Sequence, residues 1–203
     1  YSYSSPVRAI VQLLRLTPSS HSGQQVLEWR IDPSADGILH PFTDAFGNAA
    51  HAFYCDGPID DLALEVTGTV LTADTAGVVQ GAAEPLPPTL FRRVTALTRP
   101  DARIRQLARD SIAGVRDPIE QLHALMRGVH GAMAFDASAT EVNTGAHEAI
   151  ELGRGVCQDF AHVFCAAARE LGFPARYVSG HLARADRQPA KHAWAEAHVE
   201  GLG

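Results

Sequence analysis

The stretch that decides the fold is Gly153-Arg154-Gly155-Val156-Cys157-Gln158-Asp159-Phe160-Ala161-His162-Val163-Phe164-Cys165-Ala166-Ala167-Ala168-Arg169-Glu170-Leu171-Gly172. Its two leading glycines interrupt the helical pattern before them and allow a tight turn just ahead of Cys157. Beyond Cys157 the apolar residues recur at helical spacing, at Phe160, Phe164, Ala167, Ala168 and Leu171. Gly172 and Pro174 end this pattern. The spacing therefore predicts a buried helix that carries Cys157 in its first turn.

The first turn of a helix is a favourable place for a reactive thiol. Its free backbone N–H groups and the positive end of the helix dipole favour a thiolate. The same N–H groups can receive the oxyanion that develops on a substrate carbonyl. A thiol also needs a base, and the base needs a third group that fixes its tautomer. His192 is the best candidate for the base, because it begins a predicted strand that folding can bring back to the start of the helix.

Composition and charge restrict the class of protein. The chain has 203 residues, of which 46% are hydrophobic and 20% are charged, as in a soluble globular protein of one large or two small domains. A net charge of −6 gives no reason to expect nucleic acid or an anionic membrane as a partner. No apolar run approaches the ~18 residues that a membrane span needs. Cys55, Cys157 and Cys165 form neither a disulfide framework nor a CxxC pair, which favours a reducing, cytoplasmic compartment.

Residues 1–78 have the pattern of a small β-sandwich. Short β-prone runs occur at 11–16, 26–31, 49–54 and 62–71, and in the last of these the apolar residues alternate as in a half-buried strand. The segment 44–48, Asp-Ala-Phe-Gly-Asn, predicts a hairpin turn, because Gly47 and Asn48 tolerate positive φ. Residues 79–97 begin with a Pro-rich run that lacks periodicity, and they predict a linker.

From residue 98 onward the pattern becomes helical. One helix is predicted from about Asp101 to Ile112, and Asp117-Pro118-Ile119-Glu120 is a strong start signal for a second. The apolar stripe of the second helix includes Met126, which we expect to fill the core. A polar loop at 132–146, a short helical segment at 146–152 and the Cys157 helix follow. Strands at 175–182 and 192–199, joined by a loop at 183–191, complete an α+β region at 98–203.

Three segments of this region form a recognisable set: Gly155-Val156-Cys157-Gln158-Asp159-Phe160-Ala161-His162, Gly172-Phe173-Pro174-Ala175-Arg176-Tyr177-Val178-Ser179-Gly180 and His192-Ala193-Trp194-Ala195-Glu196. Together they resemble the transglutaminase-like superfamily, whose microbial members are often described as cysteine proteases. Residues 14–18 and 44–48 are similar to the β-rich N-terminal region of those bacterial proteins. The resemblance covers the whole chain, and it implies a papain-like core in which the Cys helix packs on an antiparallel sheet.

The resemblance also implies roles for individual residues. Cys157 corresponds to the nucleophile and His192 to the general base, and no cofactor is implied. The family completes a Cys-His-Asp triad with an Asp on the strand after the His strand. This sequence reaches Gly203 before such a strand, so we expect a core that is incomplete at its C-terminus, with the Asp beyond residue 203.

Two residues of the chain itself are candidates for the third group. Glu196 shares the His192 face of an alternating strand, but four residues at ~3.3 Å each put their Cα atoms roughly 13 Å apart. Asp186 lies in the loop before His192 and could reach the imidazole only by an accident of loop shape. The sequence as it stands therefore predicts a dyad of Cys157 and His192.

Other residues near the motifs have structural interpretations. Asp159 suits the helix dipole, so we expect it to cap or support the first turn rather than to react. Gln158 either helps to line the oxyanion site or lies exposed on the helix, and Trp194 is expected to pack near His192. Structural roles are expected for Cys55, Cys165, His162, His181 and His198. Cys157, His162, His192 and His198 lack a recognised ligand spacing, so no metal site is predicted.

The predicted reaction is acyl transfer on a peptide or protein substrate. Cys157 attacks an amide carbonyl, and hydrolysis of a peptide or isopeptide bond is favoured over cross-linking on the resemblance alone. The alternative is a non-catalytic peptide-binding module on the same fold. The strand at 192–199 is also expected to expose an edge, which would allow a homodimer.

Overall fold

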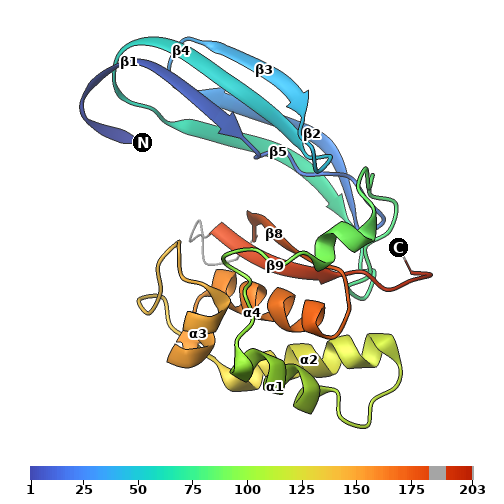
Figure 1. Ribbon diagram of the computed structural model, residues 1–203. Helices are drawn as coiled ribbons and strands as arrows, with labels where there is room; N and C mark the ends of the chain where they lie inside the picture. Colours follow the sequence, from blue (N-terminus) through green and yellow to red (C-terminus); the bar gives the residue numbers. More distant parts are fainter. Residues whose placement is uncertain (183–190, 203) are drawn as a thin grey trace. The chain divides into compact units, whose positions relative to one another are not determined.

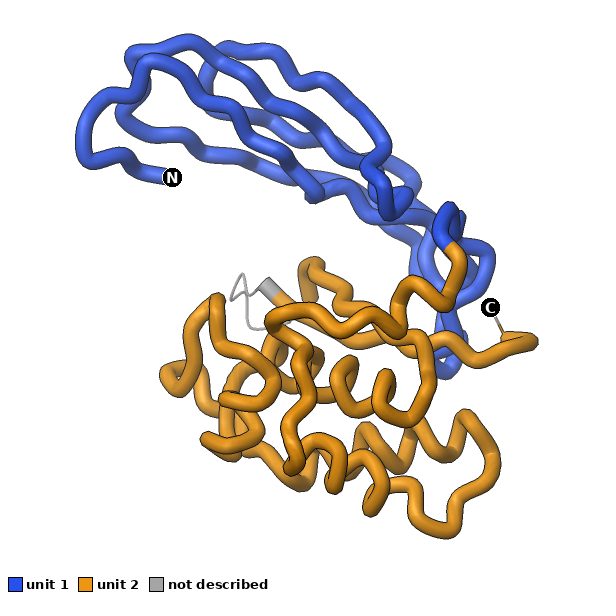
Figure 2. Tube along the Cα trace, in the orientation of Figure 1, with its two compact units in different colours: residues 1–86, 203 blue, residues 87–202 orange. Residues whose placement is uncertain are grey.

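The protein consists of two compact units, residues 1–86 and residues 87–202 (Figure 2). The computed structural model describes residues 1–182 and 191–202. Most of the loop expected at 183–191, including Asp186, lies outside these described residues.

The first unit is built from antiparallel strands (Figure 1). These are β1 (Ser2–Leu14), β2 (Gln24–Pro33), β3 (Ile38–Thr43), β4 (Ala49–Asp61) and β5 (Leu64–Thr72). One sheet has the order β1-β4-β3, and β2 pairs with β5 in the other. Both sheets contribute to one apolar core, which contains Ile10, Leu14, Ile31, Phe53, Cys55 and Leu62. The predicted β-sandwich is therefore confirmed.

The hairpin turn between β3 and β4 also agrees with the prediction. The Asp44 carboxylate accepts hydrogen bonds from the backbone N–H groups of Phe46 at 2.9 Å and Asn48 at 3.0 Å, and Gly47 has a φ of +82°. A hydrogen bond from Arg15 lowers the pKa of Asp44 below its usual range. The strand before this turn, β3, was not predicted. It contains Pro41, and its position at the edge of the sheet explains why a proline is tolerated there.

The second unit contains the predicted helices and strands (Figure 1). Its helices are η1 (Pro88–Arg92), α1 (Ala102–Ser111), α2 (Pro118–Ala132), α3 (Ala146–Leu152) and α4 (Cys157–Glu170). Its strands are β6 (Ala134–Phe135), β7 (Arg154–Gly155), β8 (Ala175–His181) and β9 (Lys191–Ala197). Asp117 caps α2 as predicted, since its carboxylate accepts a hydrogen bond from the backbone N–H of Glu120 at 3.0 Å. Asp101 caps α1 in the same way and accepts from the backbone N–H of Ile104 at 2.9 Å.

Helix α4 is the centre of this unit. It packs against α1, α2 and α3 on one side and against β8 and β9 on the other (Figure 1). Its buried residues include Val163, Cys165 and Ala166–Ala168, and they join Ile104 of α1 and Leu125 of α2 in a single core. The α+β core, with the Cys helix packed on an antiparallel pair of strands, is confirmed.

The expectation that Met126 fills the core is wrong. Met126 is 53% exposed and Ile119 is 37% exposed, whereas Leu125 and Val129 are buried. One residue further along a helix turns the side chain by about 100°, so Met126 points away from the face that Leu125 buries. The apolar stripe of α2 is narrower than the sequence pattern indicates.

Two short pairings complete the second unit. Strands β8 and β9 are antiparallel, with Ala175 opposite Ala197 and Gly180 opposite His192. Strands β6 and β7 are parallel, with Phe135 opposite Gly155, so the segment predicted as a polar loop at 132–146 begins with a strand. Among the helices that the structure describes, none is long and apolar enough to cross a membrane.

Candidate active site

Cys157 is the first residue of α4. Its side chain is partly exposed, whereas the other two thiols are buried, Cys55 at 1% and Cys165 at 0% exposure. Helix geometry leaves the first backbone N–H groups without intrahelical partners. Within the described part of the chain, the backbone N–H groups of Cys157 and Gln158 have no hydrogen-bond partner. The thiol therefore lies beside two free donors at the positive end of a helix.

Asp159 fixes the turn that carries Cys157. It is fully buried, and its Oδ2 accepts a hydrogen bond from the backbone N–H of Val156 at 2.8 Å and from the hydroxyl of Thr140 at 2.5 Å. A Cβ on Gly155 would lie 2.5 Å from the same oxygen, so only glycine leaves room for this carboxylate. The conformation of the residues just before Cys157 thus depends on Asp159.

Three side chains of α4 hold the loop that follows β6. Besides the bond from Thr140 to Asp159, the amide nitrogen of Gln158 donates to the carbonyl of Val142 at 3.1 Å. The imidazole of His162 is hydrogen bonded to the backbone of Thr144, and burial lowers its pKa. Gln158 is therefore engaged with this loop through its amide nitrogen. The sequence shows no periodic signal for these contacts, because each joins residues of a loop to residues of a helix.

The backbone brings His192 to the Cys157 end of α4. Near the C-terminal end of α4, Arg169 donates a hydrogen bond to the carbonyl of Ala175 at 2.6 Å. Near the middle of the helix, the rings of His162 and Tyr177 lie 5.2 Å apart. Strand β8 therefore runs back along α4. The five residues from His162 to Cys157 span about 7.5 Å of helix, and the three from Tyr177 to Gly180 span about 10 Å of strand.

His192 pairs with Gly180 and so lies near the level of Cys157 along this axis. Its imidazole packs edge-on against Trp194, with ring centroids 4.5 Å apart. Since Ala195 and Ala197 pack against the helical core, strand alternation puts His192 and Trp194 on the opposite face of β9. Among the described residues, no hydrogen bond joins the Cys157 sulfur to the His192 imidazole. The fold thus brings both residues to the N-terminal end of α4, but no hydrogen bond joins their side chains in the described part of the chain.

The other candidate residues have partners or surroundings of their own. Glu196 accepts a hydrogen bond from Arg176 at 2.8 Å. His181 is exposed at the end of β8, and the backbone N–H of His198 donates to Pro174. Burial raises the pKa of Cys165 to about 11, so this side chain stays a thiol. In the described ranges 1–182 and 191–202, no cluster of three His, Cys, Asp or Glu side chains is arranged to hold a metal ion.

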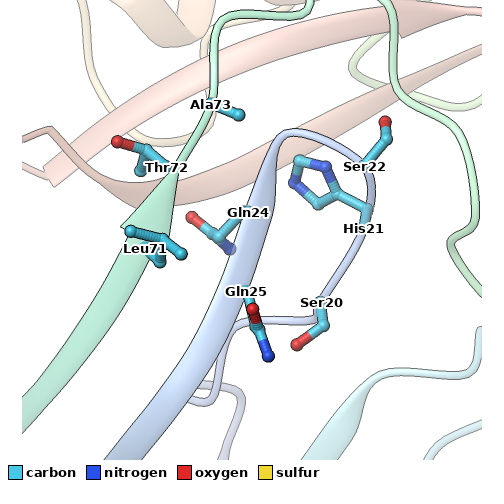
Figure 3. Close-up of a pocket in the computed structure, with 8 residues that line it drawn as sticks. All are labelled: Ser20, His21, Ser22, Gln24, Gln25, Leu71, Thr72 and Ala73. Carbon is cyan, nitrogen blue, oxygen red and sulfur yellow. The ribbon is translucent and has the colours of Figure 1, made fainter.

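A separate pocket lies in the first unit, at the turn that precedes β2 (Figure 3). It has a volume of about 290 Å³ and is lined by Ser20, His21, Ser22, Gln24, Gln25, Leu71, Thr72 and Ala73. Two of its polar side chains serve the turn itself, since His21 Nδ1 accepts from the backbone N–H of Gly23 and Ser20 accepts from that of Val26. These two hydrogen bonds stabilise the turn, so His21 and Ser20 have structural roles there.

Both units match known sequence families. The transglutaminase-like superfamily matches residues 105–203, and the bacterial transglutaminase-like N-terminal region matches residues 1–71. An uncharacterized protein of Mycobacterium leprae is 28% identical over 222 aligned positions, which cover 99% of this chain and 77% of that protein. An uncharacterized protein of Mycobacterium tuberculosis is 30% identical over 221 positions, which cover 96% of this chain and 69% of that protein.

The fold also has a solved counterpart. The crystal structure of a "putative cysteine protease" from Cytophaga hutchinsonii superposes with a TM-score of 0.76, over 97% of this chain and 70% of that one. At 18% sequence identity this likeness concerns the fold. The matched families, the relatives and the Cys helix packed on β8 and β9 agree, and this chain belongs to the transglutaminase-like superfamily.

Proposed function

We propose that the protein is a thiol acyl-transfer enzyme that hydrolyses peptide or isopeptide amide bonds, with Cys157 as nucleophile and His192 as general base. The observation that carries this proposal is the position of Cys157. Its partly exposed thiol is on the first residue of α4, beside the free N–H groups of Cys157 and Gln158 in the described chain. Membership of a superfamily that includes cysteine proteases supports the same chemistry.

In the proposed reaction the Cys157 thiolate attacks the carbonyl carbon of the amide and forms a C–S bond. The carbonyl oxygen takes the negative charge and accepts hydrogen bonds from the free N–H groups of the helix. Protonated His192 gives its proton to the amide nitrogen, the C–N bond breaks and the amine leaves. Water then attacks the thioester, His192 takes a proton from that water, and the acid and the thiol are released.

This mechanism requires His192 to reach the sulfur. Its ring packs against the edge of Trp194, so the imidazole has to turn away from the tryptophan or shift when substrate binds. Catalytic hydrogen bonds are often long in the absence of substrate and tighten in the complex. The resemblance of the His192-Ala193-Trp194 motif to the family supports His192 as the base. Its pairing with Gly180 brings its backbone near the level of Cys157, so the side chain has to come round from the face of β9 opposite the helical core.

The test uses the full-length protein and a set of short peptides assayed for amine release. Cys157→Ala and His192→Ala are expected to abolish hydrolysis. His198→Ala is the matched control, because its backbone bond to Pro174 survives the substitution and its activity should equal that of the wild type. Undiminished hydrolysis by Cys157→Ala would refute the proposal.

A second candidate is a peptide-binding module without catalysis. The packing of His192 on Trp194, with no hydrogen bond to Cys157 within the described residues, favours this alternative. Iodoacetamide separates the two at neutral pH. If the protein is an enzyme, iodoacetamide should alkylate Cys157 faster than it alkylates free N-acetylcysteine. If it is a binding module, the alkylation rate of Cys157 should be the same as that of N-acetylcysteine or slower.

A further inference from the structure

Tyr177 belongs to the motif at residues 172–180 and has no role in the proposed acyl transfer. It lies in β8 opposite Ala195 of β9. Ala175 and Ala195 pack against the helical core, so strand alternation puts Tyr177 on the face of the ribbon that meets α4. The contact is direct, because its ring lies 5.2 Å from the ring of His162, tilted by 37°. The phenol is therefore anchored on the helix that carries Cys157.

The hydroxyl of Tyr177 lies in the electrostatic field of the first turn of α4. Partial burial raises the pKa of Tyr177, and electrostatic interactions with Cys157 and Asp159 raise it further. The phenol thus stays protonated at neutral pH and keeps its O–H as a donor. The side chain is 38% exposed, so a substrate at the start of the helix has access to it.

The other polar side chains around the first turn each contact the loop that follows β6, although Asp159 Oδ1 and His162 Nδ1 have no hydrogen-bond partner among the described residues. Gln158, Asp159 and His162 are all engaged with the loop at residues 140–144. Within the described chain the Tyr177 hydroxyl has no hydrogen-bond partner, and it does not bond to the Cys157 sulfur. The donor is held on α4 by the ring contact with His162, five residues from Cys157, and it is not bonded to the sulfur.

We propose that the Tyr177 hydroxyl is a second kind of oxyanion donor, which donates a hydrogen bond to the carbonyl oxygen of the acyl group on Cys157. It acts together with the backbone N–H groups at the start of α4, and no proton leaves the phenol. The inference rests on the proposed function, because it assigns a donor to the same acyl-transfer step. Donors that are fixed before the reaction stabilise developing charge without reorganisation.

The experiment compares two reactions of Cys157 in the full-length protein. A peptide aldehyde adds to the sulfur and places an oxygen at the oxyanion position, whereas alkylation by iodoacetamide breaks a C–I bond and develops no charge on a carbonyl oxygen. Tyr177→Phe keeps the ring that packs on His162 and removes only the hydroxyl. Tyr54→Phe is the matched control, because it removes a hydroxyl from the first unit, where Tyr54 bonds to Asp56.

Tyr177→Phe is expected to weaken aldehyde binding by about 10- to 100-fold and to leave the alkylation rate within about twofold of the wild type. Tyr54→Phe should change neither. Unchanged aldehyde affinity in Tyr177→Phe would overturn the inference. So would an equal loss in both reactions, since it would mean that the hydroxyl supports the thiol or the fold, for example through Asp159. If Cys157→Ala still binds the aldehyde, the proposed function itself fails.

Discussion

The Asp159 carboxylate accepts a hydrogen bond at 2.8 Å from the backbone N–H of Val156, the residue just before Cys157. The bond closes the first turn of α4 from inside the protein, because Asp159 is fully buried. The same oxygen holds the Thr140 hydroxyl and thereby joins the turn to the loop after β6. The position of the candidate nucleophile thus depends on a buried carboxylate two residues further along the helix.

Removal of this carboxylate should destabilise the fold more than removal of an ordinary helix cap. Asp159→Ala leaves two donors without their acceptor, the N–H of Val156 and the hydroxyl of Thr140. We expect a loss of about 2–3 kcal/mol in the free energy of unfolding, against about 1 kcal/mol for Asp101→Ala at the start of α1. Urea unfolding of both variants measures the difference. A loss for Asp159→Ala no larger than that for Asp101→Ala would contradict this role.

The glycine ahead of the nucleophile is required by the same carboxylate. A Cβ at Gly155 would lie 2.5 Å from Asp159 Oδ2, so Gly155→Ala should displace the carboxylate and lower the melting temperature. Gly131 is the matched control, since it lies in α2 and nothing lies within 4 Å of its added Cβ. Gly131→Ala should stabilise the protein by about 0.5–1 kcal/mol, because alanine is the better helix former. Equal effects of the two substitutions would refute the argument.

The buried imidazole of His162 should make stability depend on pH. Burial lowers the pKa of His162 from its ordinary value of 6.5, so the folded state favours the neutral ring. The stabilisation is complete above 6.5 and is lost as the pH falls below that value toward the folded pKa, because the unfolded chain binds the proton more readily.

Urea midpoints above and below this value measure the effect. Wild-type protein should lose more stability on acidification than His162→Gln does, whereas His123→Gln, an exposed position in α2, should behave like the wild type. A fall of equal size in wild type and His162→Gln would show that other groups cause it.

Local signals explain why much of the second unit could be predicted. Asp101 and Asp117 start their helices as expected, because a capping carboxylate acts within three residues of its own position. The alternation at 192–199 also identifies β9 without knowledge of its partner. The Cys157 and His192 motifs indicated the family because they occur together at the start of a helix and the start of a strand.

The features that the sequence did not reveal depend on distant partners. Phe135 pairs with Gly155 in a parallel ladder, and two-residue strands have no periodicity to detect. The exposure of Met126 depends on how wide a face of α2 its neighbours cover. The side-chain direction of His192 follows from which face of β9 meets α4, and a motif contains no such information.

The most direct test of the central claim is the rate at which iodoacetamide alkylates Cys157 at neutral pH in wild type, His192→Ala and His181→Ala. His181 is the matched control, because it lies at the end of β8, exposed and close in the ribbon to Gly180, the partner of His192. If His192 is the base, His192→Ala should slow alkylation about 10-fold or more while His181→Ala matches the wild type. Equal rates in all three proteins would contradict the account of Cys157 and His192 as a catalytic pair.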